Sequence, residues 1–526
     1  MFQPEAFIAS LDLVFNLNTM MWLAVGVFVG VGLGAIPGLT TSTGVALMLP
    51  LTFTLNIAGA LGLVIGLYKG ALFGGSISAI SFATPGAPDS AATVFDGYKM
   101  TQKGKGRKAL LTSLYSSVTA DSLSDIVVIL IAPAMALAAL QFGPSERTWL
   151  MLLAIALLGA LSGRHVAKGM MAAAIGLFIG TIGSDPIAGA ARNTFGQAWL
   201  RDGIGLVPLI IGIFAMSRMI EQGIEITHES KLGKKVKRQM ADLFSKDQEG
   251  LTFREYLSNW REMGIGLGIG TFVGMLPGLG ATVASFLSYG VAKRFLPSKK
   301  IGTGVSAGVA AAESGNNATA GPTLVPLLAF GIPGSATAAL IGGALLLQGI
   351  TPSPRMFELH ADVVYALFII LILANVFNLV IGRGFAFFYA KLGSVPKPIL
   401  VPTIMVLAII GSYGASGNPY DVLIMLFFGF FGFGMRKFGI PEAPLVITFL
   451  IAPMLEENLR RAVMIGGGDW VPGMFDSPLS LTLMALAVLV LVTSYRMKFS
   501  ERLDDMQHQE AELSDNEGEQ KKSEST

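Results

Sequence analysis

The sequence predicts an all-α polytopic membrane protein built from two inverted-topology repeats with re-entrant hairpins and broken helices. Composition is the first reason: 52% of the 526 residues are hydrophobic and only 14% are charged, whereas soluble domains carry roughly 25% charged residues. The second reason is a series of apolar stretches long enough to cross roughly 30 Å of hydrocarbon. The third is that Pro-Gly pairs interrupt such stretches at matching places in the two halves.

The apolar segments of each half are expected to form one hairpin, one broken helix and four scaffold helices. In the first half the hairpin is at 20–55, the broken helix at 58–103, and the scaffold helices at 109–141, 148–162, 166–183 and 203–221. In the second half the order recurs, with the hairpin at 262–297 and the broken helix at 302–350, in which 302–330 is an apolar stretch long enough to span. The scaffold helices are at 363–390, 398–413, 420–435 and 443–458. The repeats are therefore placed at 1–222 and 259–460.

Three further segments complete the organisation. Residues 223–258 contain KLGKKVKR and are expected to form a basic, solvated linker, and 479–496 to form an additional transmembrane helix. The tail at 501–526 is charged and nearly free of apolar residues, so it is expected to be disordered.

Positive residues in short loops predict the orientation. The clusters at 99–108, 164–168 and 231–238 are separated by even numbers of predicted spans, so all three can lie in the cytoplasm. This places the N-terminus outside, the linker in the cytoplasm and the C-terminus inside. Arg460 and Arg461 do not fit the scheme, because they fall near a loop expected to face outward.

The composition also excludes several classes of function. The chain has no cysteine, so disulfides, thiol catalysis and cysteine-ligated metals are excluded. A net charge of +2, with basic residues in short loops, indicates no nucleic-acid partner. No HExxH and no P-loop motif occurs, so neither an enzyme, nor an ATP-driven pump, nor a bound cofactor is expected.

The two halves resemble each other in sequence but are predicted to be inverted. Residues 34–39 read GAIPGL and residues 274–279 read GMLPGL, while Pro85-Gly86 matches Pro333-Gly334. The charge scheme places Gly143 outside and its counterpart Gly393 inside. Inverted repeats with broken helices are typical of secondary transporters, whose substrate site lies between the repeats near the membrane midplane.

The four Pro-Gly breaks carry the predicted substrate site. Such a break persists in a membrane only inside protein or beside a watery cavity, and the hydroxyl residues that follow can cap a helix whose free N–H groups attract an anion. Any single break is also explained as an ordinary kink or cap, whereas four in matched pairs favour a site. The predicted substrate-binding residues are Gly38, Thr40, Thr41, Ser42, Thr43, Gly86, Asp89, Ser90, Gly278, Gly280, Thr282, Gly334, Ser335 and Thr337.

A second polar set predicts a cation site. Polar residues inside a predicted span usually face a cavity or pathway, and amide, hydroxyl and carboxylate oxygens suit a hard cation such as Na⁺. The predicted cation-binding residues are Ser76, Ser78, Glu313, Asn316, Asn317 and Thr319, with no other metal expected. Lys69 is read either as a counter-charge for a carboxylate substrate or as a structural partner of Glu313 or Asp121. Asp121 and Asp125 either relay protons or support polar packing between helices.

Three segments carry a family resemblance. Residues 32–53 read GLGAIPGLTTSTGVALMLPLTF, residues 74–98 read GGSISAISFATPGAPDSAATVFDGY, and residues 311–354 begin AAESGNNATAGPTLVPLLAFGIPGS. In these segments, and over roughly 20–475, the chain resembles the large membrane subunit of the tripartite tricarboxylate transporters. The resemblance implies a bacterial inner-membrane transporter that works with a small membrane subunit and a periplasmic binding protein.

The resemblance also implies a function. The chain is expected to import a di- or tricarboxylate such as citrate by symport with Na⁺ or H⁺, with its N-terminus in the periplasm. By fold analogy it resembles elevator-type transporters, whose scaffold often dimerises, so a homodimer is left open. The alternatives are a passive anion channel, a carboxylate transporter without a binding protein, and an intramembrane enzyme.

Overall fold

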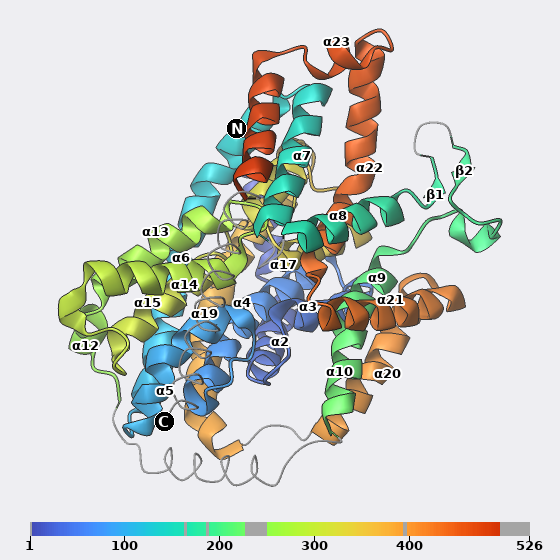
Figure 1. The fold of residues 1–526 in the computed structure, drawn as a ribbon. Coiled ribbons are helices and arrows are strands. Elements are labelled where there is room, and N and C mark those ends of the chain that lie inside the picture. Colours follow the sequence, from blue (N-terminus) through green and yellow to red (C-terminus); the bar gives the residue numbers. More distant parts are fainter. Residues whose placement is uncertain (1–2, 162–165, 186–188, 227–249, 393–396, 495–526) are drawn as a thin grey trace, which may run out of the picture.

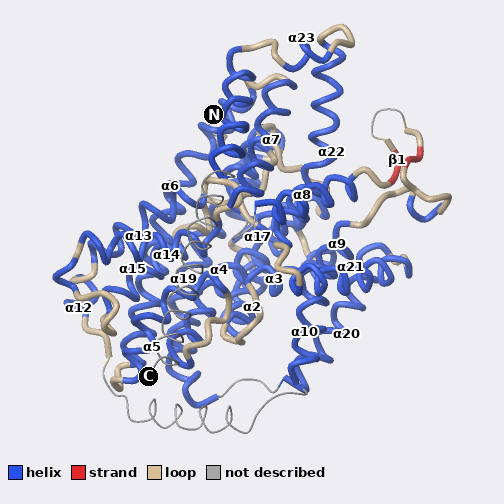
Figure 2. Tube along the Cα trace, viewed as in Figure 1, coloured by secondary structure: helices blue, strands red, loops and turns tan. Residues whose placement is uncertain are grey.

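The computed structural model describes residues 3–161, 166–185, 189–226, 250–392 and 397–494. It confirms the all-α polytopic class: the only sheet among these residues pairs β1 (Gly183–Ser184) with β2 (Ala191–Arg192). Figure 2 shows helices throughout the rest of the described chain. The tail at 501–526 and residues 227–249 of the predicted linker lie outside the described residues.

The described residues of the first half form a series of helices. They are α1 (Pro4–Val14), α2 (Leu17–Gly34), α3 (Thr41–Met48), α4 (Ile57–Phe82), α5 (Val94–Gln102), α6 (Gly106–Leu140), α7 (Pro144–Leu161), α8 (Val166–Gly180), α9 (Leu206–Ile210) and α10 (Ser217–Ile226). Short 3-10 helices lie at η1 (Leu49–Thr54), η2 (Pro88–Thr93) and η3 (Ala198–Leu200). A short π-helix, η4 (Ile211–Met216), joins α9 to α10.

The second half repeats this order with different helix lengths. Its elements are α12 (Phe253–Leu257), α13 (Trp260–Gly274), α14 (Gly280–Phe295), η5 (Pro297–Lys299), α15 (Ser306–Asn317), α16 (Leu324–Phe330), α17 (Ala336–Leu347), α18 (Met356–Leu359), α19 (Ala361–Leu392), α20 (Lys397–Ser416), α21 (Pro419–Lys437), α22 (Glu442–Ile465) and α23 (Trp470–Met474). A further apolar helix spans Pro478–Ser494.

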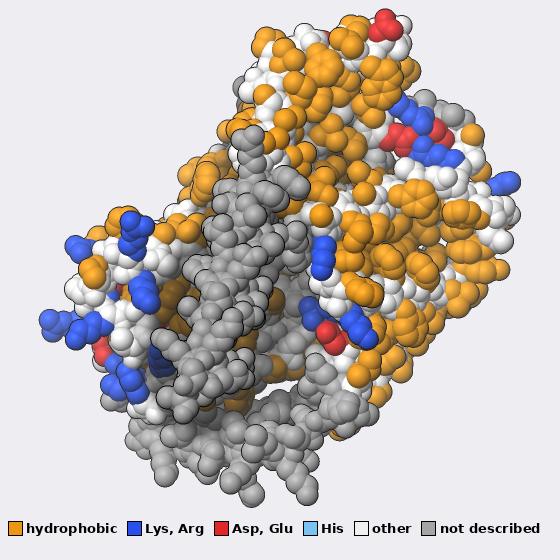
Figure 3. Space-filling model, viewed as in Figure 1, with side chains coloured by type: hydrophobic (Ala, Val, Ile, Leu, Met, Phe, Trp, Pro, Cys, Tyr) orange, Lys and Arg blue, Asp and Glu red, His pale blue; other side chains and the backbone are white. Residues whose placement is uncertain are grey.

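Six described helices are long and apolar enough to cross a membrane. They are Leu17–Gly34, Ile57–Phe82, Gly106–Leu140, Leu206–Ile224, Ala361–Ala386 and Pro419–Lys437. Shorter apolar helices lie at Val166–Gly180, Ala336–Leu347, Val401–Ser416 and Pro478–Ser494. Figure 3 shows one face covered largely by hydrophobic side chains, and residues such as Leu130 (71% exposed) and Val380 (69% exposed) extend outward from α6 and α19. An apolar surface of this extent suits contact with lipid.

Helix α4 forms the centre of the fold, because nearly all of its side chains are buried. It packs along α2 through glycines spaced four residues apart on both helices, which lets the two backbones approach closely. A Cβ added at Gly66 would lie 2.7 Å from the carbonyl oxygen of Leu23. In Figure 1, α13, α14 and α15 lie on one side of α4, and α10, α20 and α21 lie on the opposite side.

The structure corrects three predicted segments. The span predicted at 302–330 is interrupted, because turns replace the helix over 318–323 between α15 and α16. The signal was present in the sequence, since Gly321-Pro322 removes a donor and permits a bend. The linker begins later than 223, because α10 continues to Ile226, and ends earlier than 258, because α12 already starts at Phe253. The scaffold span predicted from 148 begins at Pro144.

The positive residues that did not fit the orientation scheme lie within α22 and are paired. Arg460 contacts Asp185 at 2.8 Å and Glu456 at 2.5 Å, and Arg461 pairs with Glu457 one turn away.

Candidate functional site

In each half, one backbone hydrogen bond joins the two Pro-Gly breaks. The N–H of Gly38 donates to the carbonyl of Gly86 at 3.1 Å, and the N–H of Gly278 donates to the carbonyl of Gly334 at 3.0 Å. Gly38 and Gly278 have φ values of +87° and +92°, a region that side chains strongly disfavour. The four breaks are therefore held in two pairs with the same local geometry.

The pairing extends one residue further. The N–H of Gly86 donates to the carbonyl of Gly75 at 3.2 Å, and the N–H of Gly334 donates to that of Thr323, also at 3.2 Å. Thr323 lies at the end of the interrupted segment 318–323, so the second half reaches the equivalent contact although its helix is broken and α4 is continuous.

Two of the four breaks are followed by a helix whose first residues are capped. Thr40 accepts a hydrogen bond from the N–H of Thr43 at the start of α3, and Ser335 accepts one from the N–H of Ala338 at the start of α17. The other two breaks lack such a cap: Leu279 stands at the N-cap of α14 and Ala87 at that of η2. The hydroxyl residues that follow Pro277-Gly278 and Pro85-Gly86 therefore do not cap the next helix start.

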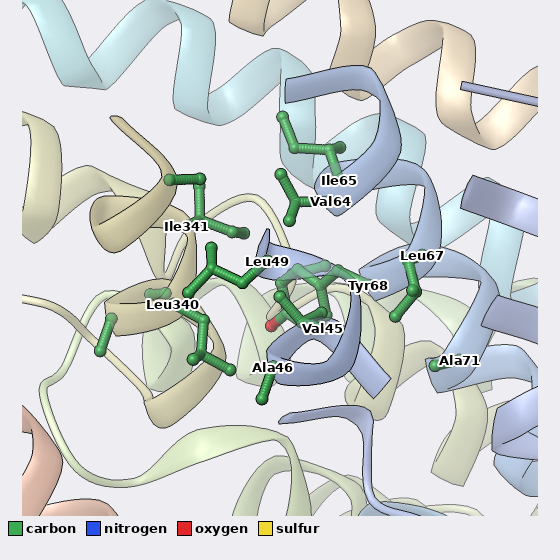
Figure 4. Packing of buried hydrophobic residues seen from close by; sticks show 14 of the residues in the cluster. Val45, Ala46, Leu49, Val64, Ile65, Leu67, Tyr68, Ala71, Leu340 and Ile341 are labelled. Atoms are coloured by element: carbon green, nitrogen blue, oxygen red, sulfur yellow. The ribbon is translucent and has the colours of Figure 1, made fainter. Parts of the chain in front are cut away.

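The two capped helices, α3 and α17, pack against each other and against α4. Figure 4 shows this meeting point, with Val45 of α3, Tyr68 of α4 and Leu340 of α17 in one buried cluster. The Tyr68 phenol interacts with the side chains of Thr323 and Ser335. Sequence analysis missed Tyr68, because an aromatic residue in an apolar helix gives no signal of a polar role.

Side-chain hydroxyl groups hold the rest of the first hairpin tip through hydrogen bonds. Thr40 Oγ1 lies 3.1 Å from Ser42 Oγ, and Thr43 Oγ1 donates to the carbonyl of Phe214 in η4 at 3.1 Å. Thr41 Oγ1 donates to Asp89 Oδ2 at 3.4 Å, while Asp89 Oδ1 is buried without a partner among the described residues. The structure therefore brings together the predicted residues at 40–43 and Asp89.

The second hairpin tip is placed differently. A Cβ added at Gly278 would lie 2.9 Å from the Cα of Leu158, so this tip touches α7. Gly280 has open space around it, and Thr282 is half-buried on α14. Thr337 is 7% exposed in the first turn of α17, and Ser90 donates to the carbonyl of Ala87 at 3.0 Å.

Glu313 lies in a fully buried cluster that joins the two halves. Its carboxylate accepts hydrogen bonds from Ser76 of α4 at 3.0 Å, from Thr93 of η2, and from Ser117 of α6 at 3.3 Å. Asn317 Nδ2 lies 3.4 Å from Glu313 Oε2 and donates to Ser117 Oγ at 2.8 Å. No cation pairs with this carboxylate among the described residues. Thr93 and Ser117 were missed from sequence, because they lie about 200 positions from Glu313.

The other predicted cation-binding residues differ in their hydrogen bonding. Asn316 is fully buried, and neither its Nδ2 nor its Oδ1 has a hydrogen-bond partner among the described residues. This is unusual, because buried polar atoms are nearly always paired. Thr319 Oγ1 donates instead to the carbonyl of Asn316 at 2.7 Å. Ser78 Oγ donates to the carbonyl of Gly75 at 3.1 Å, away from the Glu313 contacts.

Lys69 is held by both aspartates of α6. Its Nζ lies 2.9 Å from Asp121 Oδ2 and 2.5 Å from Asp125 Oδ2, and all three side chains are buried. This favours the structural interpretation of Lys69 over a counter-charge for substrate, with Asp121 rather than Glu313 as a partner. Asn375 of α19 adds a hydrogen bond of 2.9 Å to Asp125.

A further buried carboxylate was not singled out from sequence. Asp96 of α5 accepts hydrogen bonds from the N–H groups of Gly302, Gly304 and Val305 at 2.8, 2.6 and 3.0 Å, and from the hydroxyl of Tyr289 at 2.8 Å. These donors precede and flank α15, so Asp96 fixes the start of that helix. Its partners lie about 200 residues away, and no local pattern marks them.

Comparison with known proteins decides the family. The tripartite tricarboxylate transporter TctA family matches residues 20–447. The chain belongs to this family. TctA-family proteins are membrane components of tripartite transporters, which also contain a small membrane subunit and a periplasmic binding subunit. The chain is thus a multi-pass transporter component and not an enzyme.

Two relatives from Agrobacterium vitis support this assignment. An uncharacterized 52.8 kDa protein in the TAR-I ttuC' 3' region is 34% identical over 503 residues, covering 93% of this chain and 98% of the relative. An uncharacterized protein in the TAR-II ttuC' 3' region is 35% identical over 234 residues, covering 44% of this chain and 96% of the relative. No solved structure matches the chain.

Proposed function

We propose that this TctA-family chain is the translocating subunit of a binding-protein-dependent secondary transporter that imports a citrate-like di- or tricarboxylate by cation symport. It acts in the bacterial inner membrane with its N-terminus in the periplasm, beside a small membrane subunit, and receives its substrate from a periplasmic binding protein. Its two inverted repeats alternate the access of one site, formed at the Pro-Gly breaks, in an elevator-type movement.

The observation that carries the proposal is the packing of two helices with capped starts, one from each half. The starts of α3 and α17 belong to helices that pack together beside Tyr68. Free N–H groups at a helix start, aided by the helix dipole, bind carboxylates. Lys69 is the only Lys or Arg among the buried described residues, and two aspartates already hold it. The N–H groups and hydroxyls are therefore the donors available for a substrate carboxylate.

The charge of the buried cluster supports coupling to a cation. Glu313 is held by hydroxyl and amide donors alone, and an uncompensated charge inside a membrane protein is unfavourable. A cation or proton that enters near Glu313, Asn316 and Asn317 would neutralise this carboxylate and offset the charge of an anionic substrate. Asn316 supplies an unpartnered amide at this point.

The placement of the site is tested by uptake of labelled citrate into proteoliposomes that contain the chain, the small subunit and the binding protein. Gly278→Val and Asn317→Leu should each lower the uptake rate at least tenfold while the protein remains in the membrane. Unchanged uptake in both variants would contradict the placement. Uptake that rises linearly with citrate, without saturation, would favour the anion channel instead.

A further inference from the structure

The cluster around Lys69 contains more oxygen acceptors than donors. Asp121, Asp125, Asn375 and Asn378 are each at most 1% exposed, and each has one side-chain oxygen, Oδ1, without a hydrogen-bond partner among the described residues. Buried polar atoms in proteins are nearly always paired. Four unpaired oxygens in one cluster therefore call for an explanation.

The orientation of the two amides is fixed by their donor atoms. Asn375 Nδ2 donates to Asp125 Oδ2 at 2.9 Å, and its side chain also interacts with Asp121. Asn378 Nδ2 lies 3.4 Å from the carbonyl of Lys69. Exchanging the oxygen and nitrogen of either amide would set two acceptors against each other, so the unpaired atoms are oxygens.

With both aspartates ionised, the cluster has a net charge of one negative unit. Asp121 and Asp125 are both within 3 Å of the Lys69 ammonium, but one ammonium neutralises only one of the two carboxylates. The buried described residues contain no other Lys or Arg. A single positive charge would complete the balance, whereas a divalent metal would exceed it.

The cluster lies where three helices and a helix break meet. Lys69 belongs to α4, the aspartates to α6 and the asparagines to α19. Asp125 Oδ1 faces Gly321 in the interrupted segment 318–323, where a Cβ would overlap that oxygen. The unpaired carboxylate oxygen therefore lies beside the backbone of the second half's helix break.

We propose that Asp121, Asp125, Asn375 and Asn378 form a binding site for a monovalent hard cation, Na⁺, separate from the Glu313 region. Carboxylate and amide oxygens are the ligands that such cations prefer. A proton could neutralise the charge but would serve one of the four oxygens, whereas a metal ion can take all four. The inference deepens the proposed function, because it supplies a second coupling-ion site and thus rests on cation symport.

The test is direct binding of ²²Na⁺ to the purified complex at constant ionic strength, without citrate. The wild type should bind ²²Na⁺ saturably. Asn375→Ala and Asn378→Ala, which remove ligand oxygens without changing any charge, should each weaken the affinity at least tenfold. Asp125→Asn should abolish binding at this site. Thr448→Val is the matched control, since it alters a buried hydroxyl that bonds only to backbone carbonyls of α8 and α22.

Each contrary result has one meaning. Absence of saturable ²²Na⁺ binding by the wild type would overturn the inference, and so would wild-type affinity in both asparagine variants. Loss of ²²Na⁺ binding in Glu313→Gln alone would move the ion to the other region and also overturn it. Failure of the proposed function has a different signature: uptake would depend on neither a Na⁺ nor a proton gradient, even where the wild type binds ²²Na⁺ and the asparagine variants do not.

Discussion

The N–H of Gly278 donates a hydrogen bond of 3.0 Å to the carbonyl of Gly334, and so ties the tip of the second hairpin to the second helix break. Gly38 and Gly86 form the equivalent bond in the first half at 3.1 Å. The two breaks are thus joined by a hydrogen bond within each half. The two-fold occurrence of this bond supports the internal duplication inferred from sequence.

Gly278→Val should reduce uptake at least tenfold. The φ of +92° is unfavourable for valine, and its Cβ would press against Leu158, 2.9 Å away. Backbone strain of this kind amounts to about 1–3 kcal/mol, enough to shift the tip. Gly264→Val on α13, where no atom lies within 4 Å of the added Cβ, is the control and should transport normally. Equal uptake rates in the two variants would show that the tip conformation is unimportant.

Ser335→Ala should raise the KM for the carboxylate several-fold. The substitution removes the cap of α17, worth about 1 kcal/mol, together with a hydroxyl beside Tyr68. Asn418→Ala removes the comparable cap of α21, away from the predicted site. It should lower thermal stability without changing the KM. A KM that responds equally to both substitutions would mean that the caps act only through stability.

Glu313→Gln should lower uptake at least tenfold and remove its dependence on the cation gradient. The variant keeps the size of the side chain but loses the charge that the coupling cation would neutralise. Ser76 and Thr93 donate to different oxygens of Glu313, so the amide nitrogen that replaces one oxygen can no longer accept one of these two hydrogen bonds. Glu262→Gln is the control, because Glu262 is equally buried but faces Lys299 at 3.6 Å. Retention of gradient dependence in Glu313→Gln would exclude Glu313 from coupling.

Glu255 should stabilise the protein in a pH-dependent way. Its ion pair with Lys108, followed by its hydrogen bonds to Thr252, lowers the pKa of Glu255 to about 2, below the roughly 4.3 of an unfolded glutamate. A lowered folded-state pKa contributes stability above about pH 4 that is lost as the pH falls towards 2. Glu255→Gln should therefore lower the melting temperature at pH 7, by an amount that shrinks below pH 4. The effect is small, under about 1 kcal/mol, because the Glu255 side chain is 39% exposed to solvent. A difference independent of pH would contradict the ion pair.

Sequence reasoning succeeded where the cause is local. Long apolar stretches gave the helices, and Pro-Gly gave the four breaks, because proline and glycine act on their own turn of backbone. The same rule applied to Gly321-Pro322 would have found the interruption after Asn317. The capped starts at Thr40 and Ser335 were also accessible, since a cap involves residues only three positions apart.

The parts of the site that could not be predicted depend on contacts between distant residues. Lys69 could equally have paired with Glu313, and only the packing of α4 against α6 selects Asp121 and Asp125. No local pattern marks the polar residues Asp96, Thr93 and Ser117, because their hydrogen-bond partners lie in the second half of the chain. The four unpaired oxygens of the Lys69 cluster likewise emerge only when α19 joins it.

The most direct test of the account is labelled citrate uptake by proteoliposomes holding the chain and its small subunit, with and without the binding protein and an inward Na⁺ gradient. We expect saturable uptake that requires both the binding protein and the inward Na⁺ gradient. Uptake that needs the binding protein but ignores Na⁺ would contradict coupling to Na⁺ and transfer coupling to protons. Uptake that needs neither would contradict a binding-protein-dependent symporter altogether.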